Sequence, residues 1–419
     1  MNKIKKTFIV FIYVFFTGML TGCFVPKNHL SLDQRSMVIP EKATETEVLS
    51  KARVEAIDDP DVNNIKILHL KGTPYEMGFQ HGRLIQEDIK KIVNRVAGIA
   101  KILASEDMMD EVYDLMEPYI PLEEKEEMRG LAHGADIPLR VIHWYHCIPE
   151  VSEYGQNKKF LRPFHKYFFK SKSCSNIVAY GKATSDGEMY QIRVLDWMRQ
   201  VLKVQEYPVI LVHKPDIGNA SVTFGYAGFI GCISGMNDQH MAFGEMGYGD
   251  SEEESLEGKP FPFLFRELMR KSGSVDEAVK IIKQSRRTCS YAYMISDAKN
   301  NEAVSLITNR GEVIVEKTDL GTGKSPFVED AAYRGYYNEK IYQLLSENKG
   351  RINEKVLMDI SKQIGMENDN MQNVIFKPGT LEAWITNAGN AKKDEAGQAY
   401  NQKWFYYDFK KAFQDALPE

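Results

Sequence analysis

Residues 173–197 read SCSNIVAYGKATSDGEMYQIRVLDW, and this stretch predicts a β-hairpin. Residues 176–180 are mostly apolar and residues 189–195 alternate in polarity, and both patterns are typical of strands. The segment between them, residues 184–187, ends in an Asp-Gly pair that favours a tight turn. Because the strands of a hairpin run antiparallel, the end of the second strand lies beside the start of the first.

Three chemically active side chains stand at that shared end of the predicted hairpin. Cys174 opens the first strand, and Arg193 and Asp196 close the second. A thiol with a cation and a carboxylate beside it is a constellation that cleaves amide bonds. Two alternatives stay open at this point: a cysteine at the start of a core strand is often inert packing, and Arg193 with Asp196 could form a structural ion pair.

The same residues resemble a known signature. Cys174 followed by RVLDW at 193–197 resembles the Cys…Arg-Asn-Leu-Asp-Trp pattern of the isopenicillin N acyltransferase family of N-terminal-nucleophile cysteine hydrolases, with Val194 in place of Asn. Further stretches resemble the same family: GTPYEMGFQHG at 72–82, GMND at 235–238, SYAYMISD at 290–297 and the end of the chain through YYD at 406–408. The resemblance therefore covers roughly residues 65–410.

The resemblance implies an α+β fold, a four-layer αββα sandwich of two antiparallel sheets covered by helices. We expect residues 174–419 to form this core and residues 65–173 to form a mostly helical leading segment. In the leading segment we expect a strand at 65–72, followed by a helix that Thr73 caps with Glu76 as a capping box. Gly78 and Gly82 share one face of that helix and predict the close approach of another backbone.

After the hairpin, the apolar run at 228–234 predicts a strand, with a turn at 235–238. Some histidines and cysteines invite a metal-site interpretation, but no CxxC or HExxH pattern accompanies them. We therefore expect no metal and no cofactor, keep His81 as a structural residue, and predict no disulfide among the four cysteines that follow Cys23.

The resemblance also implies roles for the site residues. The relatives cut their own chain before the nucleophile, which corresponds here to the bond between Ser173 and Cys174, and the freed α-amine then serves as the base. Asp196 would hold that amine, and Arg193 would stabilise the thiolate or position the substrate. Where the relatives place asparagine donors for the oxyanion, this sequence has Glu245 and Ala292. A carboxylate donates no hydrogen bond unless it is protonated, so backbone N–H groups would have to serve.

The N-terminus has the pattern of an export signal. Lys3, Lys5 and Lys6 precede a short apolar run, and LTGC at 20–23 resembles the lipobox of bacterial lipoproteins. We therefore predict a signal peptide at 1–22, lipidation of Cys23 and a tether over 23–64. The alternatives are an ordinary N-terminal membrane anchor and, for the tether, an extended arm docked on the domain. The predicted location is the cell envelope, lipid-anchored.

The net charge of −5 is well spread, which gives no sign of nucleic-acid binding. The predicted function is an amidohydrolase that cleaves N-acyl amide bonds of a small amphiphilic substrate at a membrane surface. Two alternatives stay open: an acyltransferase that uses an acyl thioester, and a non-catalytic lipoprotein that binds acyl compounds. The sequence leaves the oligomeric state open.

Overall fold

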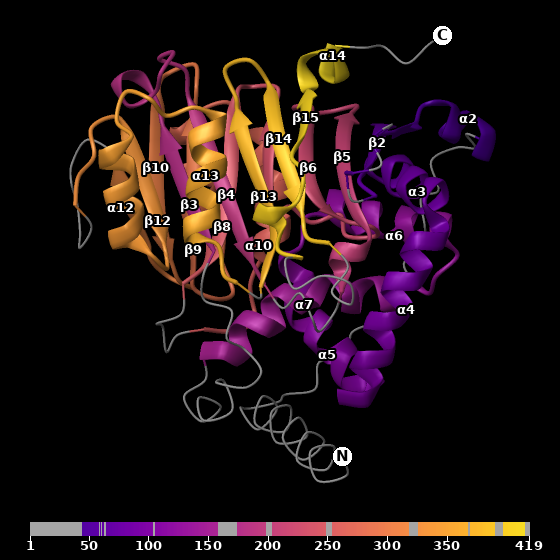
Figure 1. Cartoon of the computed structure of the whole chain (residues 1–419). Helices are drawn as coiled ribbons and strands as arrows, with labels where there is room; N and C mark the ends of the chain where they lie inside the picture. Colours follow the sequence, from indigo (N-terminus) through magenta and orange to yellow (C-terminus); the bar gives the residue numbers. More distant parts are fainter. Residues whose placement is uncertain are drawn as a thin grey trace.

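The computed structural model describes residues 44–414, except residues 58, 60, 63, 104, 158–173, 198–202, 249–253, 318–325, 368 and 390–396. Cys23, Ser173 and the predicted signal peptide lie outside the described residues. Labels of helices and strands follow Figure 1.

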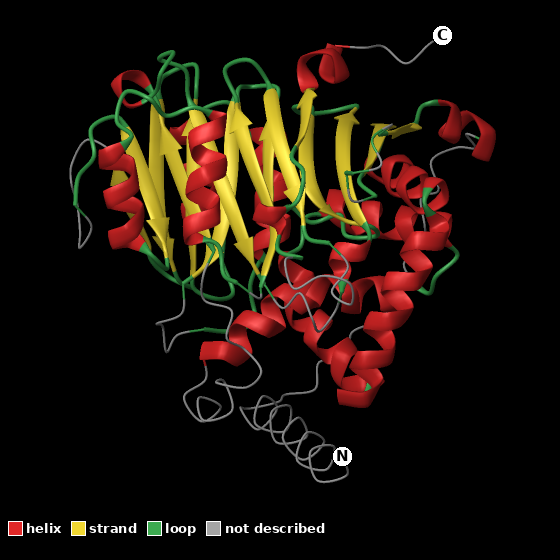
Figure 2. Ribbon diagram, viewed as in Figure 1, coloured by secondary structure: helices red, strands yellow, loops and turns green. Residues whose placement is uncertain are grey.

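Two stacked sheets form the centre of the molecule (Figures 1 and 2). The nine-stranded sheet has the order β1-β2-β5-β6-β7-β8-β9-β10-β11, and the six-stranded sheet has the order β12-β3-β4-β13-β14-β15. All neighbouring strands are antiparallel apart from β2 and β5, which are parallel. The strands of the nine-stranded sheet are β1 (Arg53–Ala56), β2 (Lys66–Gly72), β5 (Pro208–Pro215), β6 (Ser221–Tyr226), β7 (Ser234–Asn237), β8 (Met241–Gly247), β9 (Tyr291–Asp297), β10 (Glu302–Thr308) and β11 (Val313–Lys317).

The six-stranded sheet contains the predicted hairpin. Its strands are β3 (Ser175–Ala179), β4 (Tyr190–Asp196), β12 (Ala331–Gly335), β13 (Asn370–Lys377), β14 (Glu382–Asn387) and β15 (Phe405–Asp408). The predictions for β3 and β4 are confirmed to within one or two residues. Alternation along each strand sends one set of apolar side chains between the sheets and the other set outward.

Helices cover the outer faces of both sheets and complete four layers (Figure 2). The outer face of the six-stranded sheet packs against α12 (Asn338–Glu347) and α13 (Glu354–Ile364), with Ile192 and Ile360 in one core cluster. The outer face of the nine-stranded sheet packs against α10 (Phe261–Lys271) and α11 (Val275–Gln284), with Phe243 and Leu268 in another cluster. Val212, Phe224 and Phe376 fill the space between the sheets. The predicted αββα fold is therefore the observed one, with one parallel strand pair as a difference.

The leading segment is mostly helical, as predicted. Thr73 and Glu76 form the expected capping box at the start of α3. The helices of this segment are α3 (Pro74–Leu84), α4 (Gln86–Leu103), α5 (Glu106–Met116), α6 (Leu122–Ala135) and α7 (Leu139–Asn157), with a 3-10 turn, η2 (Glu117–Tyr119).

Helices α3 and α6 approach each other through glycines from both sides. A methyl group at Gly78 would overlap the Glu127 carbonyl oxygen, and one at Gly130 would overlap the Tyr75 carbonyl oxygen. Gly82 and Gly134 make equally close approaches one turn further along. The predicted close contact at Gly78 and Gly82 is confirmed, and α6 supplies the matching glycine pair.

The predicted strand at 228–234 is wrong. Residues 228–233 form an irregular loop, and the strand β7 begins only at Ser234, where we expected the preceding strand to end. Two buried histidines hold the loop: Gly228 N–H donates to His81 Nε2 at 3.1 Å, and Ile230 N–H donates to His146 Nε2 at 3.0 Å. The backbone N–H groups of Gly228 and Ile230 therefore bond to histidine side chains, whereas the apolar run predicts bonds to a neighbouring strand.

Part of the predicted tether is folded. Helix α2 (Glu45–Ser50) and strand β1 precede the leading segment, and β1 pairs with β2 at the edge of the nine-stranded sheet. Gln80 anchors α2 by donating to the Val48 carbonyl oxygen at 2.9 Å. The docked-arm alternative therefore holds for residues 45–56. The remaining elements are the 3-10 turns η4 (Gly181–Ala183), η5 (Val204–Glu206) and η6 (Ala399–Asn401), and helix α14 (Phe409–Gln414).

Across the described ranges, no helix combines the length and the apolar character that crossing a bilayer requires.

Candidate active site

The hairpin places Cys174 and Arg193 on one face of the six-stranded sheet. Asn176 pairs with Arg193 across β3 and β4, and directly paired residues share a face. Cys174 lies two residues before Asn176 and so faces the same side. The Cys174 Sγ atom is 3.6 Å from Arg193 Nη2, which makes a polar contact between thiol and guanidinium. The structure thus brings these two predicted site residues together.

A third residue, Glu245 on β8, joins them. Its Oε2 atom is 3.2 Å from Arg193 Nη2, and Arg193 Nε donates to its backbone oxygen at 3.2 Å. The neighbouring Gly244 permits this approach, because a side chain there would overlap the Asn176 amide and come within 3.2 Å of Arg193 Cγ. One guanidinium nitrogen, Nη2, therefore lies between a thiol and a carboxylate.

Asp196 approaches the thiol with its backbone, while its carboxylate contacts another part of the chain. The Cys174 Sγ atom lies 3.8 Å from the Asp196 carbonyl oxygen. The Asp196 carboxylate accepts hydrogen bonds from Asn370 Nδ2 at 2.9 Å and from the Met366 backbone N–H at 3.1 Å. Burial raises the pKa of Asp196 to about 7, and these hydrogen bonds oppose the shift. The Arg193–Asp196 ion pair considered as an alternative is replaced by the Arg193–Glu245 pair.

Among the described residues, the electrostatics of the site follow from burial and from the charge of Arg193. Burial raises the pKa of the Cys174 thiol to about 12, although the nearby Arg193 lowers it in part. Burial likewise raises the pKa of Glu245 to about 7 against the pull of Arg193. In the uncut chain the thiol is therefore protonated at neutral pH, and a base is needed before it can attack.

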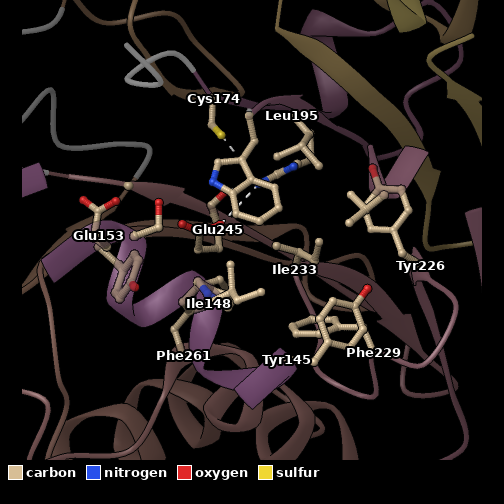
Figure 3. A pocket seen from close by; sticks show the side chains of 17 residues that line it. Tyr145, Ile148, Glu153, Cys174, Leu195, Tyr226, Phe229, Ile233, Glu245 and Phe261 are labelled. Carbon is tan, nitrogen blue, oxygen red and sulfur yellow. Dashed lines mark hydrogen bonds and ion pairs between the residues drawn. The ribbon is translucent and has the colours of Figure 1, made fainter. Parts of the chain in front are cut away.

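Cys174, Arg193 and Glu245 line a cavity of about 80 Å³. Figure 3 shows Cys174 and Glu245 on one side of this cavity, with the aromatic rings of Phe229 and Phe261 across from them. Most of the other lining side chains are apolar or aromatic, and they come from the leading segment as well as from both sheets: Tyr145, Ile148, Pro149, Leu195, Trp197, Val204, Tyr226, Ile233 and Tyr291. The remaining lining residues are Ser152, Glu153 and Gly247.

At the two expected oxyanion positions, one side chain is paired with Arg193 and the other has no polar atom. Glu245 lines the cavity but is paired with Arg193. Ala292 is buried in β9, where it pairs with Met246, and it is not among the residues that line the cavity. Sequence reasoning missed the Arg193–Glu245 pair and the tyrosines of the cavity wall, because no local motif connects strands so far apart in sequence.

In the part of the chain that the structure describes, no three His, Cys, Asp or Glu side chains come together as a metal site. His81 has a structural contact with the loop at 228–233, in line with the interpretation made from sequence. The described cysteines other than Cys174 are Cys147, Cys232 and Cys289, and all three are free thiols in the protein interior.

The fold and the site together agree with the class of protein that the sequence resemblance implies. A four-layer αββα sandwich carries a cysteine at the start of a central strand, where it faces a cavity beside an arginine.

Comparison with known proteins agrees with this class. Residues 183–322 match the family model described as acyl-coenzyme A:6-aminopenicillanic acid acyl-transferase. The match contains Arg193, Asp196 and Glu245 but begins after Cys174. It confirms the family resemblance for about a third of the chain, and with it the prediction of an enzyme of the acyltransferase and amide-hydrolase type.

Two curated relatives come from Dictyostelium discoideum. Protein dcd1A is 26% identical over 352 residues, which cover 74% of this chain and 75% of that protein. Protein dcd1B is 24% identical over 294 residues, which cover 64% of this chain and 54% of that protein. Among solved structures, an N-acylethanolamine-hydrolyzing acid amidase ortholog of Caenorhabditis elegans is 15% identical with a TM-score of 0.41, and the overlap covers 56% of this chain and all of that one. A score this low supports no conclusion about the present chain.

Proposed function

We propose that the protein cleaves or transfers an acyl group at a carbon–nitrogen amide bond, with Cys174 as the nucleophile. The observation that carries the proposal is the 3.6 Å contact between Cys174 Sγ and Arg193 Nη2 at the wall of an apolar cavity. In the reaction, the sulfur bonds to the acyl carbon, and the amine leaves with the proton that the thiol gave up. Water then attacks the thioester, releases the carboxylic acid and restores the thiol.

The base for this reaction is the α-amine of Cys174, freed by a cut between Ser173 and Cys174. A thiol with a pKa of about 12 attacks poorly at neutral pH, so the site needs a proton acceptor. The polar contacts of Cys174 Sγ among the described residues are a guanidinium and a carbonyl oxygen, and neither is a base. An α-amine with a pKa near 8 on the same residue is suited to take the thiol proton. We assign Asp196 the role of holding this amine.

The substrate is a small amphiphilic N-acyl amide. The rings and aliphatic side chains around the cavity favour an acyl chain, and the family model itself describes transfer of an acyl group to an amine. An enzyme exported and lipidated at Cys23, after removal of residues 1–22, would meet such a substrate at a membrane surface.

The decisive test is the intact mass of the protein expressed without residues 1–23, beside Cys174→Ala. We expect two fragments in the wild type, one ending at Ser173 and the other beginning at Cys174, and one uncut chain in the variant. With a chromogenic N-acyl amide, the wild type should give a burst of amine release, and the variant should give none. A single uncut chain that an acylating probe fails to label at Cys174 would refute the enzyme and leave the acyl-binding role.

The family match also supports an acyltransferase as a second candidate. An added amine acceptor distinguishes the two reactions: a transferase forms the new amide, whereas a hydrolase gives free acid whatever the acceptor concentration. Export argues for the hydrolase, because coenzyme A thioesters are cytosolic.

The anchor has a separate test. Full-length protein should partition with membranes and with the detergent phase, whereas Cys23→Ser should lose the lipid mass and leave the membrane fraction. An unlipidated wild-type protein would remove the anchor from the proposal without affecting the chemistry.

A further inference from the structure

One residue that lines the cavity has a hydroxyl group without a hydrogen-bond partner in the described part of the chain. Tyr226, the last residue of β6, is 3% exposed, and its hydroxyl oxygen is buried without a partner among the described residues. A buried hydroxyl loses its hydrogen bonds to water, and if it gains none in the protein it destabilises the fold. Tyr226 also lines the cavity, so a molecule bound there lies against the side chain that carries this hydroxyl.

A second unpartnered donor belongs to the same cavity. Arg193 contacts Cys174 and Glu245 through Nη2 and Nε, while its Nη1 atom is buried without a partner in the described structure. In Figure 3, Tyr226 stands on the far side of the cavity from Glu153, and Cys174 and Leu195 lie at the top of the view. Two residues that line the cavity with Cys174 thus each have a donor without a partner among the described residues.

Tyr226 is a donor at neutral pH. Burial raises the pKa of its hydroxyl far above the usual range, and the charge of Arg193 opposes this only in part. Arg193 acts in the same way on the pKa of the Cys174 thiol, so one guanidinium is electrostatically coupled to both groups. The phenol therefore keeps its proton, and in contact with substrate it has a hydrogen bond to give.

The chemistry of the site needs such a donor. When a thiolate attacks an amide, the carbonyl oxygen becomes an oxyanion that must be stabilised. The two positions where the family places asparagine donors hold Glu245, which is paired with Arg193, and Ala292, which has no polar side chain. A donor from a different strand would supply what these positions lack.

We infer that the Tyr226 hydroxyl donates a hydrogen bond to the substrate's carbonyl oxygen as the Cys174 sulfur attacks, an inference that rests on the proposed function. In that step the S–C bond forms and the carbonyl π electrons move onto the oxygen. Hydrogen bonds from the Tyr226 hydroxyl and Arg193 Nη1 stabilise the resulting oxyanion. Collapse restores the C=O bond and expels the amine, which carries away the proton from the thiol. Tyr226 keeps its own proton throughout.

The test is Tyr226→Phe, which removes one oxygen atom and leaves the ring. Loss of one oxyanion donor costs about 10²- to 10³-fold in kcat, and we expect that loss with KM changed little. The melting temperature should stay the same or rise, since the variant no longer buries an unpartnered hydroxyl. A purely structural tyrosine would give the opposite combination, a lower melting temperature with kcat per folded molecule preserved.

Tyr113 provides the matched control. Its hydroxyl is also buried without a partner among the described residues. Its ring stacks on His143 of α7, and it is not among the residues that line the cavity. Tyr113→Phe should leave kcat within about twofold, because it removes no donor from the oxyanion.

Three results would overturn the inference: Tyr226→Phe with kcat within about threefold of wild type, a loss confined to KM, or an equal loss in Tyr113→Phe. Labelling by an acylating probe separates this failure from failure of the proposed function. If the probe labels Cys174 in the wild type and Tyr226→Phe is fully active, the inference alone falls. If the wild type neither cuts the substrate nor takes the label, the proposed function falls and the role of Tyr226 falls with it.

Discussion

Two buried ionic clusters of this protein contrast in how they use arginine. In the helical cluster, Arg266 on α10 reaches Glu127 on α6 at 2.5 Å, and His213 lies 3.3 Å from the same carboxylate. In the cavity cluster, Arg193 Nη2 is shared between Glu245 at 3.2 Å and Cys174 at 3.6 Å. The first contact is short and joins two full charges, whereas the second divides one cation between two groups.

The pKa values of the two carboxyl groups differ accordingly. Burial alone would raise the pKa of Glu127, but the charge of Arg266 prevails and lowers it to about 2. At Glu245, burial prevails over Arg193 and raises the pKa to about 7. The helical cluster is thus fixed in one charge state across the physiological range, whereas the cavity cluster titrates within it. The two arginine–carboxylate pairs can therefore be distinguished within one fold by the protonation of their carboxylates.

The largest expected effect is a difference in stability between variants of the two arginines. Arg266→Met leaves the Glu127 carboxylate buried without its cation, and we expect a loss of about 3–5 kcal/mol in the free energy of unfolding. Arg193→Met should cost only about 1–2 kcal/mol at pH 6, because Glu245 already binds a proton there, but it should remove most of the activity. Urea denaturation and kcat/KM of both variants provide the measurement. Equal losses of stability would break the contrast.

A second effect concerns the helix pair on which the helical cluster rests. Gly78→Ala forces α3 away from the Glu127 backbone, and we expect a loss of about 3 kcal/mol, at the upper end for overpacking. Gly98→Ala is the control, since that exposed glycine of α4 has no atom within 4 Å of an added methyl group. It should stabilise the protein by about 0.5–1 kcal/mol through helix propensity. A neutral Gly78→Ala would show that the two helices can separate without cost.

The smallest effect, taken per pH unit, is a pH dependence of stability at Glu245. Its pKa in the folded protein, about 7, lies above the ordinary value of 4.5, so between pH 4.5 and 7 the folded chain holds a proton that the unfolded chain has lost. Stability should therefore fall as the pH rises through this window, by at most about 1.4 kcal/mol per pH unit for one proton. Glu245→Gln should flatten the profile between pH 5 and 7, as measured by urea midpoints.

Asp196 and Glu150 also have a pKa raised to about 7 by burial, so part of the slope will remain in that variant. Glu329→Gln provides a charge-matched control. Glu329 pairs with Lys182 and Lys349, and these hydrogen bonds lower its pKa to about 2, so its charge is constant over the window. An unchanged slope in Glu245→Gln would place the titration elsewhere.

Much of the fold was predictable from the sequence because its signals are local. In the hairpin of β3 and β4, Cys174 and Asp196 are only 22 residues apart. The alternation of its strands and the Asp-Gly turn suffice to predict it. The capping box at Thr73 and the glycine pair on α3 are equally local. The wrongly predicted strand at 228–234 shows the limit, since its backbone bonds go to His81 and His146, far away in sequence.

The site divides along the same line. Cys174 and Arg193 were predictable because one hairpin brings them together. Glu245 was identified as a position, but its pairing with Arg193 spans 52 residues and two sheets, and no pattern in the sequence encodes it. Tyr226 reads as an ordinary strand aromatic, because its importance depends on the cavity in front of it and on the absence of a partner for its hydroxyl within the described structure.

Strand β2 of the leading segment lies between β1 and β5 inside the nine-stranded sheet. Helix α3, which also precedes residue 173, packs against β2. A break after residue 173 would therefore nick the molecule without dividing it. Two bands would separate on a denaturing gel, while gel filtration would give one peak at an unchanged elution volume. Methods that measure size or shape under native conditions would therefore not detect such a cut, and the new N-terminus at Cys174 would remain at the cavity wall.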